Sequence, residues 1–216
     1  MRDSLNKNKI FLIISFLFFI GLGILLLLYN KDILHITINK HHTPFLDTFF
    51  KNITYLGSGW MILVLFIFLL FISYRLALML AISNLLITIV VQFLKNIVFP
   101  VSFRPKAYFD GIYDLYFIPG VQVHSMHSFP SGHSATAFSI FFFLSLVSNK
   151  PIWKFLTVVF AILTAFSRVY LSQHFMEDIL LGSVIGLLLS FLVFYYFEHK
   201  LRAKYEGSLL KLKLKR

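Results

Sequence analysis

The stretch IFLIISFLFFIGLGILLLLY, residues 10–29, is an unbroken apolar run without a single charged side chain. A helix of about 20 such residues is long enough to span the roughly 30 Å hydrocarbon core of a lipid bilayer. Basic residues precede the run, and Asn30, Lys31 and Asp32 follow it where a signal peptide would have a small-residue cleavage site. The stretch is therefore predicted to be a first transmembrane helix that is not cleaved.

The composition of the whole chain agrees with a lipid environment. Hydrophobic residues make up 58% of the 216 positions, the mean hydropathy is +0.82, and only 13% of the residues are charged. The absence of cysteine excludes disulfides, thiol catalysis and thiolate metal sites. The net charge of +11 comes mainly from basic residues at the ends of apolar runs. This placement indicates membrane topology and anionic headgroups, and no nucleic-acid partner is expected.

Five further apolar segments follow, each near the length of a membrane span. They cover residues 56–74, 76–99, 129–148, 152–171 and 175–197. Backbone polar groups find no water in the hydrocarbon core, so spanning segments of this kind form helices. No second region of different composition interrupts them. We therefore predict an all-α fold with a single domain, residues 1–216, built as an integral-membrane bundle of six transmembrane helices.

The distribution of Lys and Arg predicts the orientation of this bundle. The two ends of the chain and the short connections near Arg75 and Lys150 hold 13 of the 20 basic residues. By the positive-inside rule both termini are cytoplasmic, and the longer connections 30–55 and 100–128 face the outer side. The expected location is the plasma (inner) membrane, with a periplasmic site in a Gram-negative bacterium. The basic tail, 198–216, is either a solvated end or an anchor for anionic lipids.

A histidine and a carboxylate stand close together at the start of the sixth segment. His174 and Asp178 are four residues apart, which places them on one helix face, one turn from each other. A carboxylate there accepts the Nδ1 proton of the imidazole and leaves Nε2 free to act as a nucleophile. Continuing by fours gives Gly182, Gly186 and Ser190, small residues that let a neighbouring helix pack closely. A chance pair at a polar helix end is the alternative.

A second polar stretch, Pro130-Ser131-Gly132-His133, opens the fourth segment. Free backbone N–H groups at a helix N-terminus form an anion site, to which the Ser131 hydroxyl can add a donor. His133 is then placed to protonate a leaving oxygen. The alternative is that Ser131 and Gly132 serve only as helix caps.

Three cations complete the set of candidate residues. Arg104 and Arg168 offer planar forks for phosphoryl oxygens, and Lys95 lies at the outer end of the third segment. Taken alone, each arginine is more often a topogenic or headgroup-contacting charge, and a lysine at a helix end is more often a snorkelling anchor. Taken together, three cations suit a multiply charged anion such as phosphate.

The combined pattern resembles the three-part signature of the type 2 phosphatidic acid phosphatase family, which includes acid phosphatases and vanadium haloperoxidases. The third part of that signature is Ser-Arg, five residues, His, three residues and Asp. Ser167-Arg168, His174 and Asp178 match it without a gap, and Pro-Ser-Gly-His matches the second part fully. The resemblance covers residues 95–178 by motif, and the six-helix plan extends it along the chain.

The first part of the signature departs from the family pattern, because eight residues instead of six separate Lys95 from Arg104. The resemblance implies a two-step phosphohydrolase that needs neither metal nor cofactor. In it, His174 attacks phosphorus and becomes a phosphohistidine, with Asp178 orienting it. His133 protonates the leaving group and later activates water. The phosphoryl oxygens would be held by Lys95, Arg104, Ser131, Gly132 and Arg168.

The resemblance implies a membrane lipid phosphate as substrate: undecaprenyl diphosphate, phosphatidylglycerol phosphate, phosphatidate or lipid A phosphate. The sequence neither chooses among these lipids nor determines the oligomeric state. A non-catalytic lipid or ion transporter with the same charged cluster is the alternative function, although a transport path would distribute polar residues through the membrane depth. His124 and His127 stand near the site without a third metal ligand, so they are expected to contact an access loop.

Overall fold

The structure, a computed structural model, describes residues 8–200 and 207–209. Every regular element in these ranges is helical, and they contain no strand. In chain order the elements are α2 (Lys9–Leu28), α3 (Lys31–Asn39), α4 (Pro44–Ile53), the 3-10 turn η1 (Thr54–Gly57), α5 (Gly59–Ile72), α6 (Tyr74–Phe93), the π turn η2 (Leu94–Val98), α7 (Pro105–Tyr108), α8 (Gly132–Ser145), α9 (Pro151–Tyr170) and α10 (Met176–Lys200). The all-α prediction is confirmed for this part of the chain.

Four helices of the described chain are long and apolar enough to cross a membrane, namely α2, α6 with η2, α9 and α10. The segments Pro44–Gly57 and Gly59–Ile72 make a fifth span if they count as one, although they bend by 59° at the break between them. The predicted span 129–148 forms the 14-residue helix α8, about 21 Å long at 1.5 Å per residue. Six transmembrane helices and cytoplasmic termini therefore stay predictions.

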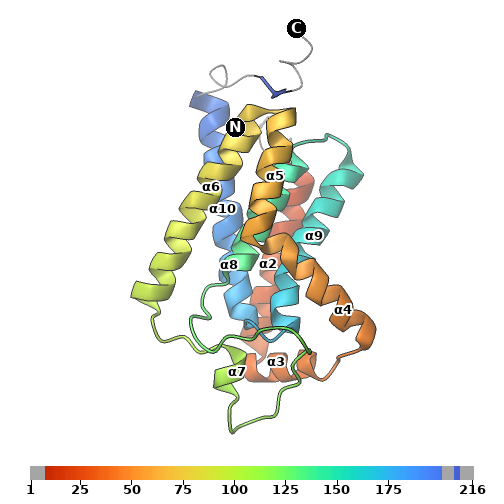
Figure 1. Ribbon diagram of the computed structural model, residues 1–216, viewed down its shortest axis with the longest axis vertical. Helices are drawn as coiled ribbons and strands as arrows, with labels where there is room; N and C mark the ends of the chain where they lie inside the picture. The colour runs from red at the N-terminus through yellow and green to blue at the C-terminus, as the bar shows by residue number, and fades with distance from the viewer. Residues whose placement is uncertain (1–7, 201–206, 210–216) are drawn as a thin grey trace.

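Helix α8 lies at the centre of the bundle, against α10, α9 and α6 (Figure 1). Most of its side chains are buried, and Phe138 and Phe142 pack edge-to-face on Phe11 of α2. Because other helices surround α8 instead of lipid, its length does not have to match the thickness of a bilayer. This central helix carries the chain from one end of the bundle to the other.

The contact between α8 and α10 depends on glycine. A Cβ atom on Gly182 would lie 2.3 Å from the carbonyl oxygen of Ser131, and one on Gly186 would lie 2.1 Å from that of Ala135. Carbon and oxygen atoms that are not bonded stay more than about 3 Å apart. The predicted small-residue stripe is confirmed at these two positions, because no larger residue fits against the α8 backbone.

Polar side chains inside the bundle bond one another across helices. The hydroxyl of Ser139 in α8 accepts hydrogen bonds from Asn84 Nδ2 of α6 at 3.0 Å and from Ser190 Oγ of α10 at 2.8 Å. Interhelical hydrogen bonds of this kind hold membrane helices together. These three polar groups are therefore engaged in helix packing.

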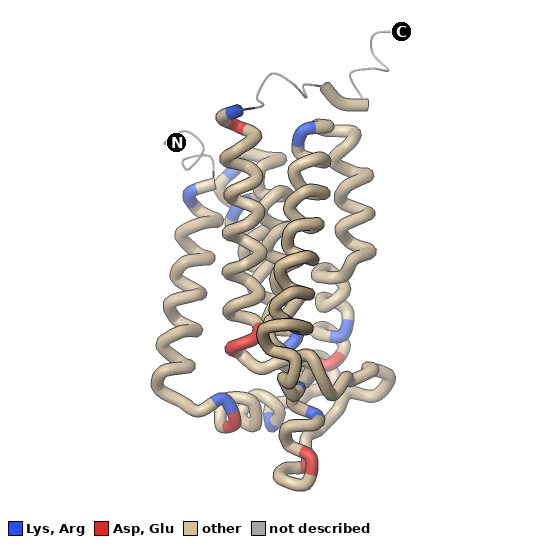
Figure 2. Tube along the Cα trace, turned by 90° about the vertical axis from the view of Figure 1, so that its left-hand side faces the viewer, with Lys and Arg blue, Asp and Glu red and all other residues tan. Residues whose placement is uncertain are grey.

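The two longer connections, 30–55 and 100–128, gather at one end of the bundle, where α3, α7 and the long segment after α6 lie together (Figure 1). Connection 30–55 is largely helical, because it contains α3 and α4. Lys and Arg concentrate near the two ends and leave most of the middle free of charge (Figure 2). Of the predicted basic tail, 201–206 and 210–216 lie outside the described residues, as do residues 1–7.

The bend between η1 and α5 lies directly beneath the first turn of α8. A Cβ atom on Gly57 would lie 2.6 Å from the carbonyl oxygen of His133, so glycine is needed for this approach. The bend thus brings Thr54 of η1 to the end of the bundle where the signature residues lie.

Candidate active site

The signature residues come together at the end of the bundle that carries the two longer connections. The charges of Arg168, Arg104 and Lys95 act on both His133 and His174. A cavity of about 420 Å³ opens beside them, and Arg104, His133 and Arg168 line it. The elements that contribute the residues are η2 (Lys95), the N-cap of α7 (Arg104), the start of α8 (Ser131, Gly132, His133), the last turn of α9 (Arg168), the following turn (His174) and the first turn of α10 (Asp178).

The predicted pairing of His174 with Asp178 is present, although His174 lies in the turn before α10 rather than on the helix. Its Nδ1 is 3.1 Å from Asp178 Oδ2, and the two side chains are 2% and 1% exposed. The same oxygen accepts the backbone N–H of Phe175 at 2.9 Å. A carboxylate in the first turn that bonds the N–H just before the helix is a capping arrangement. Asp178 therefore both caps the start of α10 and orients His174.

The electrostatic surroundings keep His174 uncharged. Burial and the neighbouring charges of Arg104, Arg168 and Lys95 hold the pKa of this imidazole well below its ordinary value. An ionised carboxylate can only accept, so Nδ1–H of His174 donates to Asp178. The lone pair then lies on Nε2, which is the arrangement that a nucleophilic imidazole requires.

Lys95 and Arg104 hold the connection that precedes α8. Lys95 Nζ donates to the His127 carbonyl at 2.6 Å, and Arg104 Nε donates to the Met126 carbonyl at 2.9 Å. Lys95 is only 8% exposed, which argues against the snorkelling alternative. It lies in the π turn η2, and a π turn contains one residue more than an α turn. The longer spacing before Arg104 falls in this turn and in residues 99–103.

The two arginines are fixed from different sides. Arg168, 7% exposed, donates through Nη1 to Thr54 Oγ1 at 2.7 Å, while its buried Nε has no hydrogen-bond partner in the described structure. Arg104 Nη1 reaches the backbone oxygen and the side-chain oxygen of Gln173 at 3.2 and 3.1 Å. A buried guanidinium N–H without a partner is a costly feature that a phosphoryl oxygen would satisfy.

Ser131 acts as the N-cap of α8. Its hydroxyl oxygen accepts the backbone N–H of Ser134 at 3.3 Å and the Ser134 hydroxyl at 2.9 Å. The capping alternative from the sequence is therefore present, and direct binding of phosphate by Ser131 stays a prediction. The backbone N–H of Ser131 donates to the Asp178 carbonyl at 2.9 Å, which joins the second signature stretch to the third. A Cβ atom added to Gly132 would make an ordinary van der Waals contact with Val91 at 3.7 Å, so packing does not require glycine there.

The structure adds residues that sequence reasoning did not find. The Ser128 hydroxyl donates to Asp178 Oδ2, so this oxygen holds three donors. Thr54 and Gln173 position the arginines. Of the two histidines already noted in the sequence, His124 lines the cavity and His127 contributes its carbonyl instead of its ring. No spacing rule connects these positions with the signature, although Ser128 lies just before its second stretch.

Metal-ligating side chains do not converge at the site. Within residues 8–200 and 207–209, no group of three His, Asp or Glu side chains could hold a metal ion. Metal independence stays a prediction. The charge that a metal would supply can come from Lys95, Arg104 and Arg168.

The site combines a buried histidine–carboxylate pair, a second histidine and three cations, and it lies on a bundle of membrane-type helices. This combination defines a phosphoric-ester hydrolase. Comparison with known proteins gives the family. The family model described as the PAP2 superfamily matches residues 74–202, more than half of the chain. The protein belongs to the PAP2 superfamily.

Individual relatives resemble this chain over most of its length. A lipid A 4'-phosphatase of Bacteroides thetaiotaomicron is 29% identical over 177 residues, covering 79% of this chain and 77% of the relative. The crystal structure of Aquifex aeolicus LpxE superposes with a TM-score of 0.67 and 31% identity, covering 76% of this chain and 93% of that one. A phosphatidylglycerolphosphate phosphatase from Bacillus subtilis gives a TM-score of 0.66 and 27% identity, with 89% and 98% covered.

Proposed function

We propose that this protein removes phosphate from a membrane lipid through a phosphohistidine intermediate. Binding of the anionic phosphate lets His133 take up a proton. His174 Nε2 attacks phosphorus, and the bond from phosphorus to the lipid oxygen breaks as protonated His133 donates that proton to the oxygen. Water then attacks the phosphohistidine and gives a proton to His133. The bond between Nε2 and phosphorus breaks, which releases inorganic phosphate and restores neutral His174. Asp178 keeps the proton on Nδ1 in both steps.

The observation that carries this proposal is the buried His174–Asp178 pair beside three cations. An imidazole whose Nδ1 is occupied presents only Nε2 to a substrate. Lys95, Arg104 and Arg168 would neutralise charge that develops on the phosphoryl oxygens. The transporter alternative is less well supported, because Asn84, Ser139 and Ser190 bond one another inside the bundle.

We further propose six membrane crossings with both termini in the cytoplasm, which places the site on the outer face of the inner membrane. The chain leaves the site end at Gly132 and reaches the opposite end before α9 begins at Pro151, so α8 acts as the fourth of the six crossings although it is short. Helix α2 begins and helix α10 ends at the end of the bundle opposite to the site, and each of these helix ends carries a lysine, in agreement with the positive-inside rule (Figure 1). A reporter fused near Asp110 should report the outer side, and a cytoplasmic signal there would reverse the orientation.

The proposed substrate is a lipid that carries a phosphomonoester. Two relatives that match this chain over more than three-quarters of its length are named for lipid A and for phosphatidylglycerol phosphate. Lipid A phosphate and phosphatidylglycerol phosphate are therefore the first two lipids to test, followed by phosphatidate and undecaprenyl diphosphate.

The test is release of inorganic phosphate from these four lipids by the purified protein in detergent. We expect the wild type to hydrolyse at least one monoester. His174→Ala should show neither turnover nor an acid-labile phosphoenzyme, whereas the exposed loop variant His41→Ala should behave like the wild type. His133→Ala should lose about 10²–10⁴-fold on alkyl phosphates and less on an aryl phosphate, whose leaving group needs less protonation. A phosphoenzyme in His174→Ala would refute the nucleophile assignment, and a wild type that is inactive on all four lipids would refute the function.

A further inference from the structure

Helix α3 carries two buried polar side chains that the mechanism above does not use. His35 is 1% exposed and Asn39 is 5% exposed, and they stand four residues apart on one face of the helix. Polar groups are rarely buried in this way unless they make hydrogen bonds. Their partners therefore indicate what this face of α3 does.

Both side chains bond the same atom, the hydroxyl oxygen of Ser172. His35 Nε2 lies 3.2 Å from Ser172 Oγ, and Asn39 Nδ2 donates to it at 3.2 Å. Ser172 is 1% exposed and lies in the turn between α9 and α10, two residues before His174. Its φ of 51° is in the left-handed region, which residues other than glycine rarely adopt. A conformation of this kind persists only where its surroundings hold it.

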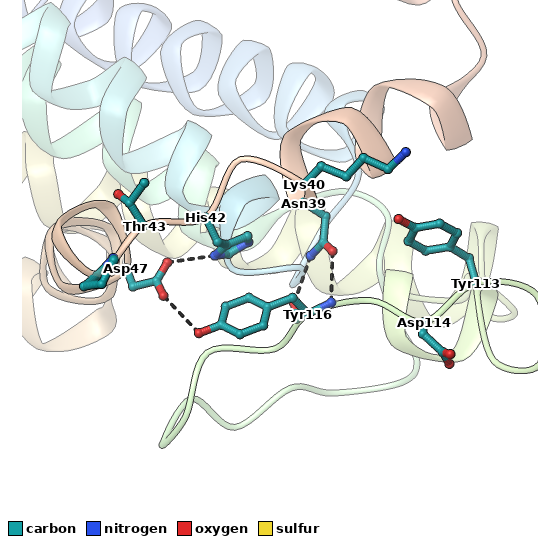
Figure 3. Close-up of a pocket in the computed structure, with 9 residues that line it drawn as sticks. Asn39, Lys40, His42, Thr43, Asp47, Tyr113, Asp114 and Tyr116 are labelled. Atoms are coloured by element: carbon teal, nitrogen blue, oxygen red, sulfur yellow. Dashed lines mark hydrogen bonds and ion pairs between the residues drawn. The ribbon is translucent and has the colours of Figure 1, made fainter.

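Asn39 also holds the outer connection. Its side-chain oxygen accepts the backbone N–H of Tyr116 at 2.9 Å, and its Nδ2 donates to the Tyr116 carbonyl at 2.9 Å (Figure 3). The Tyr116 hydroxyl donates to Asp47 Oδ2 at 3.1 Å, beside a second cavity of about 470 Å³. Four residues further on, Gly120 lines the cavity that contains the arginines. One amide group therefore connects the turn of His174 with the wall of the substrate cavity.

His35 is held on its other sides by aromatic rings. Its imidazole stacks on Phe109 with the ring centres 5.6 Å apart and meets Phe175 edge-on at 5.3 Å. Burial lowers its pKa to about 4, with a small opposing effect from the Asp178 charge, so the ring is neutral at neutral pH. A neutral imidazole with Nε2 towards Ser172 is a hydrogen-bonding group and not an ion-pair partner.

We propose that His35 and Asn39 are positioning residues of the phosphatase reaction, acting through the Ser172 hydroxyl to hold the turn that aims His174 at the phosphate site. Asn39 additionally sets the position of the outer connection against the cavity. The proposal rests on His174 being the nucleophile, as in the proposed function. It gives α3, which lies outside the signature region, a defined part in catalysis.

The first experiment separates the hydrogen bond of His35 from its packing. His35→Phe keeps a ring between Phe109 and Phe175 but removes the bond to Ser172, so we expect kcat to fall about tenfold with KM little changed. His35→Gln places an amide nitrogen near the position of Nε2 and should recover most of the loss. Thr37→Ala, on the exposed face of the same helix, is the matched control and should retain wild-type kinetics.

The second experiment tests the shared atom by a double-mutant cycle. Ser172→Ala and His35→Phe remove the same bond, so the double variant should lose no more kcat than the more damaging of the two single variants. Asn39→Ala should raise KM as well as lower kcat, because it also releases Tyr116. Additive losses in the cycle, or a His35→Gln variant no more active than His35→Phe, would show a purely structural role and overturn the proposal.

A readout independent of turnover keeps this proposal separable from the proposed function. The rate at which diethyl pyrocarbonate modifies His174, followed by peptide mass spectrometry, should rise in His35→Phe and Ser172→Ala but not in Thr37→Ala. If the wild type hydrolyses none of the four lipids, the proposed function fails while this rate still tests the positioning of His174. An unchanged rate in both variants would overturn the positioning role.

Discussion

Replacing Gly182 by alanine should damage catalysis more than stability, because the added methyl group meets the backbone of the site. The new Cβ would lie 2.3 Å from the Ser131 carbonyl oxygen, whereas a non-bonded carbon and oxygen need about 3.3 Å. Helix α10 and the start of α8 must therefore separate by about 1 Å. The 2.9 Å hydrogen bond from Ser131 N–H to the Asp178 carbonyl would stretch beyond hydrogen-bonding distance.

The expected magnitudes follow from this displacement. Overpacking of one methyl group costs about 1–3 kcal/mol in the free energy of unfolding. A shift of about 1 Å between His174 with its carboxylate and the anion-binding start of α8 is expected to lower kcat about 10²-fold. The assay is the initial rate of phosphate release, measured beside thermal unfolding in the same detergent.

Two other glycines make the comparison decisive. Gly21→Ala in α2 adds a methyl group with nothing within 4 Å, so activity should be unchanged. Gly186→Ala meets the Ala135 carbonyl oxygen at 2.1 Å, one turn further from the site, and should cost at least as much stability but less activity than Gly182→Ala. A Gly182→Ala enzyme within about threefold of wild-type kcat, or an equal loss from Gly186→Ala at equal stability, would refute the reasoning.

Three further predictions concern the chemistry. Activity should persist in excess EDTA, and an EDTA-induced loss of activity that Mg²⁺ or Zn²⁺ restores would contradict the metal-independent mechanism. Millimolar vanadate should inhibit the enzyme, because it imitates a trigonal-bipyramidal transition state. Because burial and nearby cations lower the pKa of His174, the fall of kcat/KM on the acid side should begin below pH 6.5. Arg104→Gln removes a positive charge and should raise that pKa, so its activity relative to the wild type on the same substrate should decrease as the pH falls; a constant ratio would count against it. Ser128→Ala removes a charge-assisted donor to Asp178 and should lower kcat about 10–100-fold, whereas Ser125→Ala in the same connection should not.

The sequence predicted the long helices well, because a lipid environment makes length and apolarity sufficient signals. The run 10–29 corresponds to α2, and 152–171 corresponds to α9, each to within one residue at either end. The bend of 59° after Gly57 was not predictable in the same way. The stretch Gly57-Ser58-Gly59 indicates a turn but not its angle, which depends on the close approach of Gly57 to the distant His133 carbonyl.

The residues of the candidate site also differ in how far the sequence could predict them. Residues that share a short stretch, such as His174 and Asp178, reveal their contact through their spacing. Ser128, Thr54 and the pair His35 and Asn39 support the site from other elements, up to 137 positions away in the chain. Contacts of that kind depend on how helices pack, and a single sequence carries no periodic signal for them.

The double use of Asp178 has a consequence for how the protein is made. Its carboxylate begins α10 and orients His174, and its carbonyl receives the N–H of Ser131. Ribosomes deliver a chain from its N-terminus, so α10 is the last of the described long helices to enter the membrane. Until it arrives, His174 has no partner and the start of α8 lacks one of its anchors. If His174 is the nucleophile, as proposed, a nascent chain is inactive until α10 has packed against α8.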